Sequence, residues 1–360
     1  MDWVQTLKEV IRDSGVKEVL TDSMGPLYDP MREVFWGVWE GVWTAVLPSS
    51  SARLFWLYIL STLAIALSIY LSRCYRAQGR SLRGFLEFFL PASIFGHRSA
   101  IVDYKFYFVS RIVASFVSFG SLIVSAVLIA EYCTALLGFL FGPVESQQEA
   151  SVLTRFVYTG LIVVAIDAGF FIAHYLQHKV PFFWEFHKVH HSAEVLTPIS
   201  GQRFHPVDKI LQGFFMGSLA GITTGAFAYF FSNGVNEIVI LNCSIVFFVY
   251  NLTANLRHSH IWLSYGWRLS HIFSSPAMHQ IHHSSAARHI DKNFGLVFSF
   301  WDYLASTLYV PKEREDLEWG LKNQEHREYS TIWKLYVLPV QKVGRMLVGR
   351  GKQPNGLESA

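Results

Sequence analysis

The sequence predicts an all-α integral membrane protein, with about five transmembrane helices and a histidine-rich helical cap on the cytosolic side. Three observations support this fold class. Hydrophobic residues make up 51% of the 360 residues and the mean hydropathy is +0.28, which is too apolar for an ordinary soluble domain of this size. Several stretches approach the roughly 20 apolar residues that a membrane-spanning helix needs. Histidines recur at spacings that place them on one face of a helix.

Five stretches are predicted to span the membrane. Residues 54–72, 112–130 and 210–231 contain no charged residue, and residues 156–173 contain only Asp167. The fifth stretch, residues 238–254, is shorter and carries Asn242 and Asn251. The first residues of the chain are charged and amphipathic, so a signal peptide is not expected.

Basic residues indicate which ends of the spans face the cytosol. The loop between the first and second spans carries Arg73, Arg76, Arg80, Arg83, Arg98 and Lys105. The next loop is acidic and has no basic residue before Arg155. With five spans, this alternation places the N-terminus outside, and all the histidine groups and the C-terminus on the cytosolic side. The membrane would be the inner membrane of a bacterium or the endoplasmic reticulum of a eukaryote.

Four segments follow from these patterns. Residues 1–53 are expected to form an amphipathic segment at the membrane interface, and residues 54–150 to hold the first two spans. Residues 151–310 hold the other three spans and all the histidine groups. Residues 311–360 are charged and are expected to form a cytosolic tail, with its last dozen residues disordered.

Three further features limit the function. The interfacial location of the first segment is predicted from an aromatic stripe that consists of Phe35, Trp36, Trp39 and Trp43. The alternative interpretation is a soluble helix packed on the body of the protein. The three cysteines have unrelated spacings, which indicates neither disulfides nor a zinc knot. A net charge of +3 with a basic tail favours anionic lipid heads, and no motif for nucleic-acid binding is present.

The histidines concentrate between residues 174 and 289, in groups with helical spacing. The main groups are His174-x3-His178, His187-x2-His190-His191 and His279-x2-His282-His283. Positions i, i+3 and i+4 share a helix face, so each group is expected to aim its rings in one direction. Neutral imidazole is the commonest metal ligand, and these eight rings are too many for one ion. The sequence therefore predicts a two-metal site.

The ligand chemistry indicates a redox metal. Structural zinc sites usually include cysteine, and none lies near these groups, although zinc could occupy the site in a purified sample. Glu185 and Glu194 do not form the Glu-x-x-His pattern of soluble di-iron bundles. His205, His258 and His260 are each candidates to complete the coordination. His271 and His289 carry weaker signals, and His97 and His326 lie far from the groups in the sequence.

Asp167 lies seven residues before His174, on the same helix face. An acid inside a span is costly and usually functional. We expect Asp167 to orient a metal-bound histidine through its free ring N–H. A helix-packing hydrogen bond and a contact to substrate are the alternatives.

The order of these motifs resembles the fatty acid hydroxylase/sterol desaturase superfamily, from about Asp167 to Thr307. The telling strings begin at Phe186 (FHKVHHS), Arg203 (RFHP), Pro276 (PAMHQIHHS), Asp291 (DKNFG) and Trp301 (WD). The eight-residue gap between His178 and His187 argues against the acyl-CoA desaturases, whose first two boxes lie farther apart.

The resemblance implies a membrane non-haem di-iron enzyme, which uses O2 and two electrons to hydroxylate or desaturate a membrane lipid. The electrons would come from a separate cytochrome b5-, ferredoxin- or reductase-type protein. The implied iron ligands are His174, His178, His187, His190, His191, His205, His258, His279, His282 and His283, with His258 preferred to His260. Side chains expected beside these ligands are Asp167, His260, His289, Asp291 and Asn293.

The chain also departs from the family pattern. The family often ends in Trp-Asp-x-x-Phe-Gly-Thr, whereas this chain reads WDYLAST from Trp301 to Thr307, and His289 stands where relatives often have an aromatic residue. Residues 1–53 and the first span look like an addition to a four-span core.

Two other function classes are weighed against a lipid oxidase. A divalent-metal transporter would need polar residues through several spans, and only Asp167, Asn242 and Asn251 qualify. A scaffold stabilised by structural zinc would unfold when the metal is removed. The sequence names neither the lipid nor the choice between hydroxylation and desaturation, and no GxGxxG fingerprint indicates a bound nucleotide cofactor.

Overall fold

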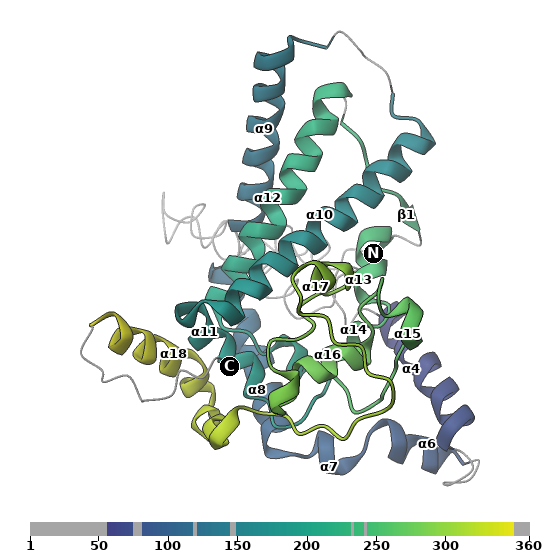
Figure 1. Ribbon diagram of the computed structural model, residues 1–360, viewed down its shortest axis with the longest axis vertical. Helices are drawn as coiled ribbons and strands as arrows, with labels where there is room; N and C mark the ends of the chain where they lie inside the picture. The colour runs from purple at the N-terminus through teal and green to yellow at the C-terminus, as the bar shows by residue number, and fades with distance from the viewer. Residues whose placement is uncertain are drawn as a thin grey trace, which may run out of the picture.

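The computed structural model describes residues 56–74, 81–117, 121–144, 149–231, 234–240 and 243–348. This part of the chain is mostly helical, with one pair of two-residue antiparallel strands, β1 (Val239–Ile240) and β2 (Cys243–Ser244). Three long helices form an arm that rises from a body of shorter helices (Figure 1). The predicted interfacial segment 1–53 and the last dozen residues lie outside the described residues.

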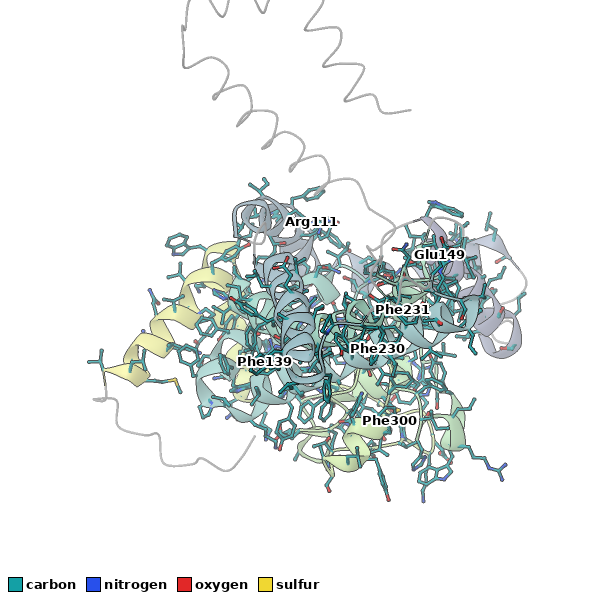
Figure 2. The ribbon with its side chains drawn as sticks, turned by 90° about the horizontal axis from the view of Figure 1, so that it is seen from above. Arg111, Phe139, Glu149, Phe230, Phe231 and Phe300 are labelled. Atoms are coloured by element: carbon teal, nitrogen blue, oxygen red, sulfur yellow. The ribbon has the colours of Figure 1, made fainter. Side chains whose placement is uncertain are left out.

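The arm consists of α9 (Ser121–Phe141), α10 (Val152–Lys179) and α12 (Pro206–Phe230), and α12 packs against the other two. At 1.5 Å per residue, α10 is about 42 Å long and α12 about 37 Å, and both exceed the roughly 30 Å of a bilayer's hydrocarbon core. By length and composition, these are the two helices in the described ranges that are able to cross a membrane. Figure 2 shows the arm end-on, with Phe139 of α9 and Phe230 of α12 labelled.

Glycine lets α12 approach α9 closely. A Cβ atom at Gly221 would lie 2.5 Å from the carbonyl oxygen of Ala126, and one at Gly225 would lie 2.4 Å from that of Ala130. Both separations are too short for real atoms, so larger residues at these positions would force the helices apart.

The first two predicted spans correspond to helices with different bounds. The first, residues 54–72, contains α4 (Trp56–Ile69). The second, residues 112–130, begins inside α8 (Arg98–Val117) and ends in the middle of α9. The prediction stopped at Glu131 because that residue is charged, but Glu131 is exposed and the helix continues to Phe141.

The prediction of a fifth spanning helix over 238–254 is wrong. The residues described there form β1, β2 and α13 (Ile245–Asn251), a helix of seven residues that is only about 10 Å long. Side chains of α10 bind the non-helical backbone: Arg155 donates to the carbonyl oxygens of Asn236 and Glu237, at 3.2 Å each. The hydroxyl of Thr159 accepts from the backbone nitrogen of Ile238 at 3.0 Å. Because these groups are satisfied by neighbouring protein, the segment does not need to be helical.

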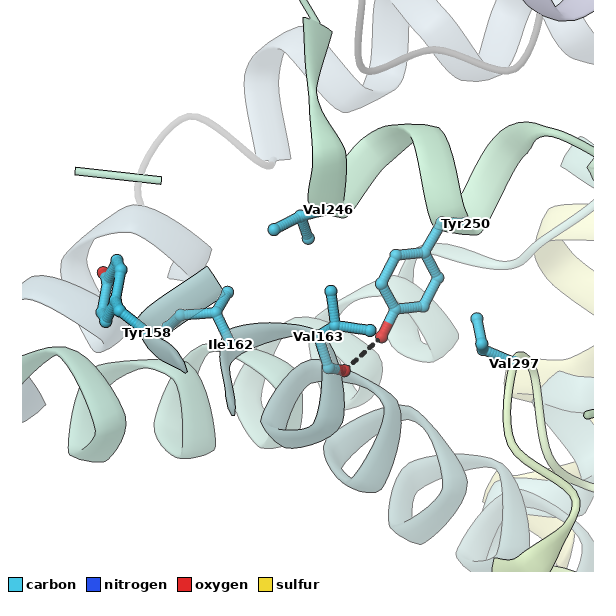
Figure 3. Close-up of a cluster of buried hydrophobic side chains, with 6 residues drawn as sticks. All are labelled: Tyr158, Ile162, Val163, Val246, Tyr250 and Val297. Atoms are coloured by element: carbon cyan, nitrogen blue, oxygen red, sulfur yellow. Dashed lines mark hydrogen bonds between the residues drawn. The ribbon is translucent and has the colours of Figure 1, made fainter. Parts of the chain in front are cut away.

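A buried apolar cluster joins the arm to the body (Figure 3). Ile162 and Val163 of α10 meet Val246 and Tyr250 of α13, and Val297 packs against them from the body. The Tyr250 hydroxyl donates to the carbonyl oxygen of Val163 at 2.9 Å, so its one polar group is paired inside the cluster.

The body consists of short helices around the base of the arm. The α-helices are α6 (Leu82–Phe89), α7 (Ala92–Phe95), α8, α11 (Pro181–His191), α14 (Ala254–Arg257), α15 (Gly266–Leu269), α16 (Pro276–His282), α17 (Phe300–Leu304) and α18 (Ile332–Leu347). A π-turn covers Tyr70–Cys74, and 3-10 turns cover Ser200–Gln202, Ala287–His289 and Lys322–Tyr329. α4 lies beside α14, where the hydroxyl of Thr62 accepts from Asn255 at 3.2 Å.

Candidate metal centre

Four helices bring the histidines together. His174 and His178 stand in the last two turns of α10, which ends at Lys179 because Val180 is extended and Pro181 begins α11. α11 carries His187, His190 and His191. α16 carries His279 and His282, with His283 as its C-cap, and His258 is the C-cap of α14.

The rings form two adjacent groups. One ring nitrogen from each of His174, His178, His187, His191 and His282 lies within 4.8 Å of the others, and we name this the five-histidine group. The same limit defines the four-histidine group of His190, His258, His279 and His283. The groups touch, since the ring centroids of His191 and His283 are 4.4 Å apart.

Each HxxHH motif divides its rings between the two groups. From α11, the i and i+4 rings of His187 and His191 join the five-histidine group, whereas His190 joins the other. From α16, His279 and His283 join the four-histidine group, whereas His282 joins the first. The expectation that each HxxHH motif aims its three rings at one place is therefore corrected: both HxxHH motifs contribute to both groups, whereas His174 and His178 lie together in the five-histidine group.

The ring nitrogens that point into the five-histidine group have no partner. The Nε2 atoms of all five rings are buried and accept or donate no hydrogen bond within the described residues. Buried polar atoms are normally hydrogen-bonded, so five converging ring nitrogens without a hydrogen bond are unusual unless a ligand binds them. In the four-histidine group, His279 Nε2 lies 3.0 Å from His258 Nε2 and 3.2 Å from His283 Nε2. One ring N–H cannot serve both neighbours, whereas a shared cation would satisfy all three.

Several opposite ring nitrogens are fixed by acceptors. The Nδ1 atoms of His174 and His282 lie 2.8 Å from the carbonyl oxygens of Phe294 and Lys292. A carbonyl oxygen only accepts, so Nδ1 carries the proton in both rings and the lone pair of Nε2 points into the group. The Nδ1 atom of His258 lies 3.2 Å from the hydroxyl of Ser200.

Burial keeps histidines of the two metal groups neutral. Desolvation, reinforced by repulsion from neighbouring rings, holds the pKa values of His190, His191, His279 and His283 well below the usual value near 6.5. Neutral rings offer lone pairs to a metal. With nitrogen donors alone and no thiolate, the two groups fit a pair of ions such as Fe, Zn, Cu or Ni.

Three predicted site histidines lie outside both groups. His205 caps α12: its Nδ1 accepts from the backbone nitrogen of Val207, and its Nε2 donates to the carbonyl oxygen of Tyr336, at 3.2 Å each. His260 bonds the carbonyl oxygen of Phe88 at 2.7 Å, and His289 bonds Glu315 at 3.0 Å. Because both nitrogens of His205 are engaged by backbone, the structure does not bring that ring to the metal groups, whereas it does bring His258.

The predicted acid Asp167 bonds a loop and no histidine ring. It accepts from the backbone nitrogens of Val297 and Phe298 at 2.9 and 3.0 Å, and from Trp301 Nε1 at 3.0 Å. Asp167 therefore fixes the loop whose Phe294 carbonyl orients His174, so any influence on that ring is indirect.

Asp291 and Asn293 lie in the segment that follows α16, and Asp291 contacts a histidine of the five-histidine group. Asp291 sits 3.7 Å from His178 Nδ1 and forms an ion pair with Lys179. Asn293 braces the loop by pairing with both backbone groups of Tyr309, at 2.7 and 2.8 Å, from a left-handed conformation with φ of 59°.

The prediction missed Asp208. Its Oδ1 lies 3.2 Å from His187 Nδ1 and accepts from Gln177 Nε2 at 2.8 Å, while Oδ2 accepts from the backbone nitrogen of His205. The available signal was an acid three residues after His205, the N3 position of a capping box at the start of α12. That signal marks a helix start and does not reveal the contact to His187.

Comparison with known proteins agrees with this geometry. Residues 159–307 match the family described as fatty acid hydroxylase. The chain is 27% identical to ornithine lipid hydroxylase OlsE of Rhizobium tropici over 56% of its length, and 23% identical to alkylglycerol monooxygenase of Caenorhabditis elegans over 48%. It is 26% identical to human (Homo sapiens) cholesterol 25-hydroxylase over 41% of its length.

These alignments cover 55%, 32% and 49% of the three relatives, so the chain spans about half of their length or less. No solved structure matches the chain significantly. The family match runs from α10 to the residues after α17 and contains all nine histidines of the two groups. Over this segment, the comparisons support the resemblance to the fatty acid hydroxylase/sterol desaturase superfamily that the histidine motifs indicate.

Proposed function

We propose that this protein is a membrane-bound oxygenase that hydroxylates or desaturates a lipid at a histidine-ligated di-iron centre. The observation that carries the proposal is the convergence of five buried, unpartnered Nε2 atoms beside a second group of four histidines. All three relatives are named for the oxygenation of lipids, which supports this reaction class.

The two groups would each hold one ion. When bound, the iron pair supplies the oxidising power by which O2 attacks an unactivated C–H bond. The chain's own residues set the geometry: α10, α11 and α16 hold the rings, and the carbonyls of Phe294 and Lys292 keep two Nε2 lone pairs pointing inward. Burial of His187 and His190, at 0% and 2% exposure, excludes water from the centre.

The arm would place the centre at a membrane surface. A hydrocarbon core of about 30 Å takes up about 20 residues of helix, so a core that starts at Val152 ends near Phe171. His174 and His178 then emerge at the interface. A lipid could keep its chain beside the arm while its reacting carbon reaches the centre.

We propose that α4, α9, α10 and α12 are helical spans, that the chain returns to the body through the segment that holds β1, β2 and α13, and that the body faces the cytosol. The basic residues between α4 and α8 support this orientation. Residues 151–310 would form the catalytic unit. The electrons would come from a separate redox protein that docks on the cytosolic side, because no nucleotide-binding fingerprint occurs in the sequence.

The decisive experiment measures metal content and O2 use by the full chain in lipid nanodiscs. The purified protein should hold about two metal ions per chain, as the count of nitrogen ligands requires. Iron-loaded protein with a reductant and a lipid extract should consume O2 and add one oxygen to a lipid or remove two hydrogens. Mass spectrometry of the lipids identifies both the reaction and the substrate.

Three variants make the test specific. His282→Ala and His283→Ala each remove one ring from a different group, and each should abolish turnover. His326→Gln is the control, because His326 bonds the carbonyl oxygen of Leu321 and belongs to neither group. Full turnover by His282→Ala would refute the assignment. Zinc removal that unfolds the protein, with no redox activity at any iron loading, would favour a structural zinc scaffold instead.

A further inference from the structure

Helix α18 presents an apolar surface that nothing in the described chain covers. Its buried side carries Leu335, Pro339 and Val343, which pack against the body. Trp333, Val340 and Leu347 are 73%, 55% and 73% exposed, and we name these three residues the outer stripe. They are seven residues apart, so they point in nearly one direction after every two turns. Singly exposed apolar residues are ordinary, but a Trp-led row along a helix marks an interaction surface.

Basic residues flank the outer stripe. Lys334 and Arg345 are exposed and lie about 100° around the helix from the stripe, with Gln341 between them. The helix sequence contains no Asp or Glu. α18 therefore has three faces: one packed on the body, one apolar and exposed, and one polar and basic. This is the composition of helices that lie in a bilayer interface, where the apolar face meets acyl chains and cations meet phosphates.

The contacts of α18 hold it at the base of the arm. The carbonyl oxygen of Tyr336 accepts from Nε2 of His205, the residue directly before α12 begins. The Tyr336 ring also packs on Phe106 of α8, with centroids 5.0 Å apart. Figure 1 shows α18 beside α11, where the arm joins the body, and Figure 2 shows it extending outward from the arm.

Ion pairs attach α18 to the rest of the body. Lys342, on the inner side of α18, pairs with Glu325 at 2.5 Å and with Glu328 at 3.0 Å. Glu325 also pairs with Lys188 of α11 at 3.1 Å. These ion pairs therefore fix the position of α18 relative to α11.

Exposed apolar residues also lie at the base of the arm. Ile210 and Phe214, in the first turns of α12, are 45% and 54% exposed. The His205 contact sets the second turn of α18 beside the start of α12. The first part of α18 therefore lies near the point where α12 would enter lipid.

We propose that α18 is an interfacial anchor, whose outer stripe inserts into the cytosolic leaflet while Lys334 and Arg345 bind anionic lipid phosphates. This inference rests on the membrane orientation given under the proposed function. A second copy of the chain fits less well, because a symmetric contact through the stripe would bring the basic flanks of two α18 helices together.

Depth-dependent quenching tests the anchor in the full chain. The three cysteines are replaced by serine, and the resulting protein is checked for unchanged metal content. A bimane fluorophore is then attached to Val340→Cys or, as the matched control, to Gln341→Cys on the polar side of the same helix. The protein is reconstituted in anionic vesicles that contain lipids with a nitroxide high on the acyl chain. Insertion by 5–10 Å should give the Val340→Cys label about twofold stronger quenching than the Gln341→Cys label.

A third label separates failure of the anchor from failure of the membrane topology. Phe139 of α9 is 85% exposed, and a label at Phe139→Cys should be quenched by lipid if α9 is a span. Quenching at Phe139→Cys, with Val340→Cys as weakly quenched as Gln341→Cys, overturns the anchor and leaves the topology standing. No quenching at either Phe139→Cys or Val340→Cys overturns both.

Charge reversal tests the basic flank. Lys334→Glu with Arg345→Glu should lower quenching at the Val340→Cys label in anionic vesicles but not in zwitterionic ones, because only the former offer excess negative charge. Equal quenching in both kinds of vesicle, with and without the reversal, contradicts the assigned role of these cations.

Discussion

The Nδ1 atom of His187 lies 3.2 Å from Oδ1 of Asp208, which connects the five-histidine group to the first turn of α12. The same carboxylate accepts from Gln177 of α10 and from the backbone of His205. One buried acid therefore fixes α10, α11 and α12 relative to one another. It also holds the His187 ring so that Nε2 faces the group.

Removal of this carboxylate should weaken metal binding. Asp208→Ala frees the His187 ring to rotate and leaves Gln177 without its partner, so affinity at the five-histidine group should fall roughly 10- to 100-fold. Equilibrium dialysis followed by elemental analysis measures the loss. Asp208→Asn, which keeps one acceptor oxygen, should recover part of it. Unchanged affinity in Asp208→Ala would show that the carboxylate does not position the ring.

The neighbouring histidines His258 and His260 should behave differently. His258 lies in the four-histidine group, whereas His260 bonds the Phe88 carbonyl away from both groups. His258→Ala should weaken metal binding at the four-histidine group, because one of its four nitrogen ligands is lost, and a metal titration measures the change in affinity. His260→Gln should retain both ions. The reverse outcome would show that His260, and not His258, is the metal ligand.

The ion pair of Arg203 and Asp103 should dominate the stability of the body. Arg203 donates to Asp103 at 3.0 Å, to Ser99 at 3.1 Å and to the Tyr329 carbonyl at 3.1 Å, and both charged side chains are buried. Asp103→Asn leaves a buried guanidinium without its counter-charge, which should cost about 3–5 kcal/mol.

Thermal unfolding in detergent measures this cost. In the double variant Asp103→Asn with Arg203→Met, no charge is left unpaired, so its melting temperature should exceed that of Asp103→Asn alone. A double variant that is less stable than both single variants would contradict the pair as the source of the effect.

Loss of the Asp167 carboxylate should loosen the loop beside His174. Its three accepted hydrogen bonds are each worth about 1.5–3 kcal/mol, because the acceptor is charged. Asp167→Ala should therefore accelerate amide hydrogen exchange across residues 294–301, measured by mass spectrometry. Exchange in α18 serves as the internal reference, since the hydrogen bonds of Asp167 go to Val297, Phe298 and Trp301. Unchanged exchange at Val297 and Phe298 would show that the loop is held by other contacts.

Packing of the arm should depend on Gly225. A methyl group there would lie 2.4 Å from the Ala130 carbonyl oxygen, so Gly225→Ala should cost about 1–3 kcal/mol as α12 moves from α9. Gly138 of α9 is the matched control, because a Cβ at that position meets nothing within 4 Å. Gly138→Ala should leave the melting temperature unchanged or raise it, since alanine favours a helix. Equal destabilisation by both variants would argue against the close approach.

Spacing alone was sufficient to identify eight of the nine histidines, since residues at i, i+3 and i+4 share one face of any helix, and it left His258 as one of three further candidates. The sequence also identified α10 and α12, because a long uncharged run has few structural options. It was wrong at residues 238–254, where the composition resembles a span. Arg155 and Thr159 bind the non-helical backbone at the start of that stretch, and they lie 81 and 79 residues from their partners Asn236 and Ile238. The hydropathy of a segment gives no information about hydrogen bonds to residues elsewhere in the chain.

Local spacing by itself thus determined the helical fold class, the histidine motifs and the nitrogen-only donor set. Only the tertiary structure decided that each HxxHH motif serves two groups, that His258 joins them and that His205 caps a helix. The reason is that ring orientation depends on what the other ring nitrogen touches. Those partners, Asp208, Phe294, Lys292 and Ser200, lie between 10 and 120 residues from their rings in the sequence and meet them only after folding.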